Sequence, residues 1–96
     1  MSAASEREAK ITALLQAAFA PVVCKLIDES AAHAGHAGAA SGGSHYRLHL
    51  VATTFENRSR IDRHRLVYDC LRDMMQSEIH ALALTTAAPS ETSGTT

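Results

Sequence analysis

Residues 45–51, HYRLHLV, alternate polar and apolar side chains, and this pattern decides the fold. Successive side chains of a β-strand point to opposite faces of a sheet, so a strand covered on one side alternates in this way. Tyr46, Leu48 and Leu50 would then face a core, while the histidines and the arginine between them would face solvent. We predict a strand from His45 to Thr53 that is covered on one face.

Two further segments predict strands. Residues 22–28, VVCKLID, are short, apolar and partly β-branched, which favours a strand. Side chains alternate again from Ile79 to Thr86, with His80 at the start of the segment. Residues 29–44 between the first two strands are rich in Ala, Gly, Ser and His, which predicts a long mobile loop. We expect the first two strands to pair.

Two capping signals predict where helices begin. Ser5 is followed by Glu8, which matches a capping box, and the apolar repeat that follows lasts until Pro21. Ser59 is followed by Asp62, which predicts a second helix start. The helical spacing after it predicts a buried stripe made of Val67, Cys70, Leu71, Met74 and Met75.

The order of these elements predicts an α+β fold in which helices cover one face of a small sheet. The chain has 96 residues, enough for one domain. We place this domain at residues 1–86. The last ten residues, 87–96 (AAPSETSGTT), are small and polar and predict a disordered C-terminal tail.

Composition narrows the functional classes. Nine basic and ten acidic residues give a net charge of -1, which argues against a whole-protein field built for nucleic acid or acidic membranes. Cys24 and Cys70 form no CxxC motif and are interpreted as small core residues in a reduced, cytoplasmic protein. No stretch approaches the roughly 20 apolar residues that cross a bilayer.

Six histidines are the residues best suited to chemistry, because neutral imidazole binds zinc, iron and copper. His33 and His36 lie in the glycine-rich loop, while His80 opens the predicted last strand. A rigid ligand on a strand and a mobile one in a loop would suit a site that closes on a partner. His45 and His49 are interpreted as surface residues of a strand.

The order of four motifs resembles the BolA family. They are HYRLHLV at 45–51, FEN at 55–57, RHRLVY at 63–68 and IHAL at 79–82. The resemblance runs from about residue 8 to residue 86 and implies an α-β-β-α-α-β fold akin to the class II KH domain. One departure is Asn57, where the family usually has glycine; Asn tolerates the left-handed backbone conformation, so we expect the turn to survive.

The resemblance implies a BolA-like adaptor that is not an enzyme. Its implied partner is a monothiol, CGFS-type glutaredoxin, with which it would share a 2Fe-2S cluster that also uses glutathione. The family's cluster histidine matches His80, and its loop ligand matches His33, with His36 left open as an alternative. The chain alone would bind a cluster poorly, because four ligands are usual, and it would be a monomer or a weak dimer.

An alternative function is DNA binding by a transcriptional regulator with a KH-like fold. A basic helix start can contact phosphates or enter a major groove. The Gly-x-x-Gly loop that clamps the backbone in KH domains is missing. The candidate DNA-binding residues are Arg58, Arg60, Arg63 and Arg65. No catalytic constellation has a recognisable spacing.

Overall fold

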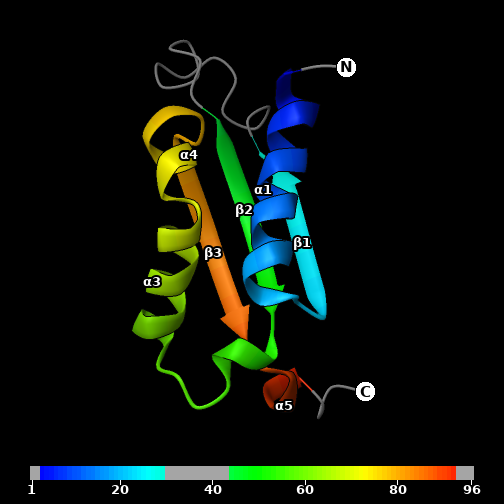
Figure 1. Cartoon of the computed structure of the whole chain (residues 1–96), viewed down its shortest axis with the longest axis vertical. Coiled ribbons are helices and arrows are strands. Elements are labelled where there is room, and N and C mark those ends of the chain that lie inside the picture. The colour runs from blue at the N-terminus through cyan, green and yellow to red at the C-terminus, as the bar shows by residue number, and fades with distance from the viewer. Residues whose placement is uncertain (1–2, 30–43, 93–96) are drawn as a thin grey trace.

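A computed structural model describes residues 3–29 and 44–92. Three strands form one sheet, in the order β1 (Val23–Asp28), β2 (His45–Val51) and β3 (Ala81–Ala87). Helices lie against one face of this sheet (Figure 1). The α+β architecture predicted from the order of elements is therefore confirmed.

The strands pair in two different senses. β1 runs antiparallel to β2, as predicted for the first two strands, and β2 runs parallel to β3. Parallel pairing needs a crossover connection, which the two helices between β2 and β3 supply. Because β2 and β3 are parallel, both begin at the same end of the sheet (Figure 1). β3 begins at Ala81 and not at Ile79, so the prediction that His80 is a strand residue is wrong.

The first helix, α1 (Ala3–Phe19), begins before the predicted cap. Ser5 is inside the helix, so its capping role is wrong, and the two preceding alanines are strong helix formers. The helix ends at Phe19, and the next residue, Ala20, has a left-handed φ of 43° and donates its N–H to Gln16 O at 3.0 Å. Pro21 follows, as predicted for the end of the repeat.

The crossover consists of α3 (Arg60–Cys70) and α4 (Arg72–Ser77). Ser59 caps α3 by accepting a hydrogen bond from Asp62 N at 3.1 Å, which confirms the second capping signal. Leu71 separates the two helices, with φ −101° and ψ 13°. The predicted stripe faces the sheet: Val67, Leu71 and Met74 are buried, and Cys70 and Met75 pack against the core.

The other end of the β2–β3 pair is closed by short elements. The 3-10 turn η2 (Thr53–Phe55) follows β2, and Asn57 after it has a φ of 60°, which confirms the expected left-handed turn. β3 continues to Ala87, and α5 (Pro89–Thr92) follows it. The predicted disordered tail from residue 87 is therefore wrong for residues 87–92, while residues 93–96 lie outside the described residues.

A single core lies between the sheet and the helices. Tyr46, Leu48 and Leu50 of β2 are at most 1% exposed, which confirms the alternation predicted for this strand. The rings of Phe19 and Phe55 lie 5.4 Å apart and extend the core toward η2. Among the described residues, no helix is long and apolar enough to cross a membrane.

Candidate functional site

Two histidines meet where β2 and β3 begin. His45 is the first residue of β2, and the register pairs it with Ala81, the first residue of β3. His80 therefore lies diagonally across from His45, in a bend just before β3, and is exposed. The ring centroids of His45 and His80 are 5.2 Å apart, with an angle of 52° between the ring planes. The fold thus brings two imidazoles to one end of the sheet.

Main-chain hydrogen bonds hold this arrangement. The N–H groups of His80 and Ala81 both donate to Ser44 O, at 2.9 and 3.0 Å. On the other side, Glu29 N donates to His45 O at 2.8 Å, so the pairing of β1 with β2 continues beyond the end of β1. The positions of the two rings follow from backbone that is fixed on both sides.

A hollow of about 320 Å³ adjoins His45 on the sheet surface. Arg47 Nε donates to Glu29 Oε2 at 2.9 Å at its edge, and both side chains are partly exposed. The small side chains of Ala81 and Ala83 on β3 keep the hollow open. Glu29, Arg47 and His45 therefore put polar side chains, two of them of opposite charge, around one apolar depression.

The remaining candidate histidines divide into two groups. His33 and His36 lie outside the described residues. His49 is further along β2, where its Nδ1 forms a hydrogen bond with Thr85 Oγ1 at 2.7 Å, and His64 lies on α3. Within residues 3–29 and 44–92, no group of three or more His, Cys, Asp or Glu side chains is arranged to bind a metal ion.

The two cysteines are half-buried packing residues, as predicted. Cys24 and Cys70 both pack against the core, and burial raises the pKa of each thiol. Cys70 Sγ also lies 3.4 Å from Leu14 O, to which it donates. The thiolate is the form of cysteine that binds metal, and burial disfavours it here.

The four arginines of segment 58–65 differ in burial, because one of them is buried and paired inside the protein. Arg63 is 8% exposed and donates to both carboxylate oxygens of Glu91, at 2.7 and 2.8 Å, and to Arg58 O at 2.9 Å. Arg58 donates through Nε to Thr54 O at 2.9 Å, while Arg60 and Arg65 are exposed. The guanidinium of Arg63 is used within the protein, so three arginines of the predicted four are left at the surface.

Glu91 has a second hydrogen-bond partner besides Arg63. Its Oε1 also accepts from Ala88 N at 2.8 Å, and Glu56 accepts from Ser90 Oγ at 2.7 Å nearby. The hydrogen bond from Arg63 and that from Ala88 N lower the pKa of Glu91 from its ordinary 4.5 to about 2. These contacts attach α5 to the start of α3.

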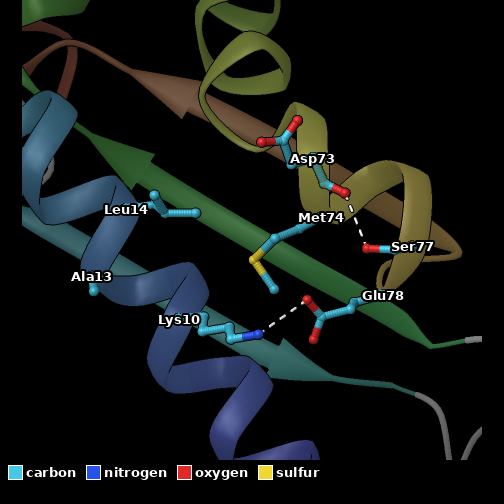
Figure 2. Close-up of a pocket in the computed structure, with 7 residues that line it drawn as sticks. All are labelled: Lys10, Ala13, Leu14, Asp73, Met74, Ser77 and Glu78. Atoms are coloured by element: carbon cyan, nitrogen blue, oxygen red, sulfur yellow. Dashed lines mark hydrogen bonds and ion pairs between the residues drawn. The ribbon is translucent and has the colours of Figure 1, made fainter.

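A second hollow, of about 410 Å³, separates α1 from α4 (Figure 2). Leu14 and Met74 form its apolar floor, and Lys10 Nζ lies 3.3 Å from Glu78 Oε2 across its edge. Glu78 is two residues before His80, so this hollow and the histidine pair share one connection.

A family model described as BolA-like protein matches residues 15–91, which is most of the chain and includes all three strands and the α3–α4 crossover. The chain belongs to the BolA-like protein family. The resemblance that the sequence motifs indicated is therefore confirmed.

Three relatives illustrate the range of this family. BolA-like protein 1 of Mus musculus is 38% identical over 90 residues, which cover 94% of this chain and 64% of the relative. DNA-binding transcriptional regulator BolA of Escherichia coli is 36% identical over 85 residues, 88% of this chain and 78% of the relative. SufE-like protein 1, chloroplastic/mitochondrial, of Arabidopsis thaliana is 37% identical over 94 residues, 93% of this chain but 25% of the relative. The chain thus spans less than two thirds of the mouse and plant relatives.

A solved BolA structure has the same fold. The BolA domain of SufE1 from Arabidopsis thaliana has a TM-score of 0.79 to this chain and 34% identity, covering 95% of this chain and 98% of that one. The BolA-like fold predicted from the motifs is therefore confirmed at the level of three-dimensional structure.

Sequence reasoning missed two features of these sites. His45 was assigned to the solvent face of a strand, and its contact with His80 depends on the parallel register of β2 and β3. A signal was available, because each histidine stands at the start of a predicted strand. Glu91 was also missed, and here the sequence offered only a glutamate in a polar tail.

Proposed function

We propose that this chain is a non-enzymatic adaptor that binds a monothiol, CGFS-type glutaredoxin and shares a 2Fe-2S cluster with it. The role would be iron-sulfur trafficking or regulation by iron and redox state. The observation that carries the proposal is the His45–His80 pair, with ring centroids 5.2 Å apart and His80 exposed. Membership of the BolA-like family supports the proposal, because the resemblance of the sequence motifs implies such a partner.

The donor chemistry fits a cluster of this type. Imidazoles replace two thiolates on one iron in Rieske centres, so nitrogen ligands from this chain are chemically suitable. In the proposal, His80 is one ligand, and His33 of the loop is the second, with His36 as an alternative. His45 is a further candidate for the second position, because its ring is the one beside His80 among the described histidines. Cluster binding by the chain alone would be weak, because the glutaredoxin and glutathione supply the other ligands.

The side chains around the histidine pair would form the surface that contacts the glutaredoxin. The Arg47–Glu29 ion pair and the hollow of about 320 Å³ lie on the sheet face beside His45. Side chains of opposite charge around an apolar depression give an interface both orientation and buried area. We propose that the glutaredoxin contacts this end of the sheet, where it could complete the ligand set.

The test is the visible absorption and circular dichroism of the chain reconstituted with a CGFS glutaredoxin, glutathione, iron and sulfide. We expect a spectrum that differs from that of the glutaredoxin alone. His80→Ala should abolish this new spectrum, because removing a ligand leaves the iron incompletely coordinated. His33→Ala, His36→Ala and His45→Ala, measured in parallel, identify the second ligand by the same loss.

His49→Ala is the matched control. His49 lies on the same strand and the same sheet face as His45, but it bonds to Thr85 and not to the pair. Its substitution should leave the spectrum unchanged. A wild-type complex whose spectrum equals that of the glutaredoxin alone, or a spectrum that survives His80→Ala, would rule out the adaptor proposal.

DNA binding is the second candidate function, and the name of the Escherichia coli relative is the observation that favours it. Arg58, Arg60 and Arg65 are the exposed arginines that could contact phosphates. Binding would then weaken with salt, and each of Arg60→Gln and Arg65→Gln would reduce the salt slope by about 1. Fluorescence anisotropy of labelled duplex DNA at several salt concentrations checks this, and an unchanged slope in both variants would exclude these residues.

The proposal includes a cytoplasmic setting. Cys24 and Cys70 are both free in the structure, which suits a reducing compartment. The plant relative named above carries the words chloroplastic/mitochondrial. Microscopy of a fluorescent fusion expressed from the native locus tests the setting directly, and a signal confined to an organelle would overturn it.

A further inference from the structure

Ser44, the residue before β2, is buried next to the backbone of the His45–His80 pair. It is 2% exposed, and a buried hydroxyl needs a hydrogen-bond partner. The Ser44 hydroxyl donates to the main-chain oxygen of Glu78. Its own carbonyl accepts from the N–H groups of His80 and Ala81, at 2.9 and 3.0 Å. Ser44 therefore binds the connection between α4 and β3 at three points.

The same connection is held from the helix side. The N–H groups of Glu78 and Ile79 both donate to Met74 O, at 2.7 and 2.8 Å, and Ile79 is buried. The Glu78 side chain also reaches Lys10 on α1 at 3.3 Å (Figure 2). This bridge is largely exposed and contributes little. The Ser44 hydroxyl thus adds a side-chain hydrogen bond from the residue before β2 to this connection.

We propose that Ser44 is a positioning residue for His80. Its hydroxyl fixes the carbonyl two residues before His80, and its carbonyl fixes the N–H of His80 itself. Since the same residue precedes His45 in the chain, it sets the distance between both rings. The proposal rests on the proposed function, in which His80 is a cluster ligand.

The experiment compares Ser44→Ala, which removes the hydroxyl, with Ser44→Thr, which retains it. Ser77→Ala is the matched control, because Ser77 Oγ also donates to a main-chain oxygen, that of Asp73, at 3.1 Å in the neighbouring helix (Figure 2). Two quantities are measured. The first is the rate at which a chelator bleaches the visible circular dichroism of the glutaredoxin complex. The second is the proton–proton nuclear Overhauser effect between the rings of His45 and His80 in the chain alone.

We expect Ser44→Ala to bleach roughly tenfold faster than wild type, the low end of the effect of residues that orient a metal ligand. The nuclear Overhauser effect between the two rings should fall by about half or more in this variant, because the rings can separate when the backbone before His80 is no longer held. Ser44→Thr should restore both quantities, and Ser77→Ala should change neither. Recovery in Ser44→Thr shows that the hydroxyl itself is responsible, and Ser77→Ala shows that loss of a serine-to-main-chain hydrogen bond elsewhere has no such effect.

Two results would overturn the inference. One is a Ser44→Ala complex that bleaches at the wild-type rate with an unchanged inter-ring effect. The other is Ser44→Ala and Ser77→Ala changing both quantities equally. If the wild-type complex gives no spectrum of its own, the proposed function fails and with it the ligand role of His80. The inter-ring effect then still decides whether Ser44 positions the two rings.

Discussion

The two ends of the parallel β2–β3 pair use their polar residues in opposite ways. At the end where both strands begin, main-chain hydrogen bonds and the Ser44 hydroxyl hold the backbone, and the rings of His45 and His80 lie side by side with His80 exposed. At the end where both strands stop, charged side chains hold the fold together, because Arg63 and Glu91 join α3 to α5. We call these the histidine end and the arginine end.

The difference shows which polar residues are available for function. A charged group whose hydrogen bonds are all made inside the protein has little left to offer a ligand, and Arg63 is in this position. A polar side chain on a backbone fixed by other groups can exchange its contacts without disturbing the fold, and exposed His80 is in that position. The motif RHR at 63–65 thus contains one residue that supports the fold beside a neighbour, Arg65, that faces solvent.

The largest expected effect comes from breaking the arginine end. Arg63→Met keeps the aliphatic stem but removes the donors to Glu91 and to Arg58 O, so a carboxylate and a carbonyl in part-buried hydrogen bonds both lose their partner. Because a 1 kcal/mol loss shifts Tm by several degrees in a domain of this size, we expect Tm to fall by roughly 5 °C or more. Thermal denaturation followed by circular dichroism measures this.

Arg60→Met is the control for this substitution. Arg60 starts the same helix and is exposed, so the same change of side chain should move Tm by less than about 2 °C, as is usual for surface positions. Equal shifts in the two variants would show that Arg63 is not special and would remove the contrast between the two ends.

The elements of the fold that the sequence predicts are those set by local patterns, and the element that it misses depends on a contact between distant residues. Alternation in residues 45–51 is enough to predict β2, and Ser59 with Asp62 is enough to predict the start of α3, because both patterns are local. The Arg63–Glu91 pair joins residues 28 positions apart, and α5 is a single turn that is attached by this pair and by the Glu56–Ser90 hydrogen bond. Its local sequence therefore reads as a tail.

The candidate site was predictable in part for a similar reason. His80 could be chosen as a candidate because it stands beside an alternating apolar segment and matches the family motif. Its contact with His45 depends on the register of two parallel strands, which the α3–α4 crossover sets and no local pattern encodes. Which loop histidine joins them remains a prediction, since His33 and His36 lie outside the described residues.

A smaller effect is expected from pH, through Glu91 at the arginine end. Hydrogen bonds from Arg63 and from Ala88 N lower the pKa of Glu91 to about 2, below its ordinary 4.5. A carboxyl group with a lowered pKa stabilises the folded state above its ordinary pKa, and this contribution disappears as pH falls toward the folded value. Stability should therefore decrease between about pH 5 and pH 2 through this group.

Glu91→Gln isolates this contribution. Glutamine cannot ionise, so the variant should be less stable than wild type at neutral pH and should converge on it near pH 2. Urea denaturation of both proteins across this pH range gives the comparison. If the two stability curves stay parallel from pH 5 to pH 2, Glu91 is not the group that titrates.

The smallest expected effect is that of a substitution at the histidine end on the stability of the fold. His80 is exposed, precedes β3, and is held by its main-chain N–H, which alanine retains. His80→Ala should therefore change the free energy of unfolding by no more than about 0.5 kcal/mol. Urea denaturation at neutral pH measures this. A loss well above that value would mean that the imidazole supports the fold, and the loss of a cluster spectrum in this variant would then no longer identify a ligand.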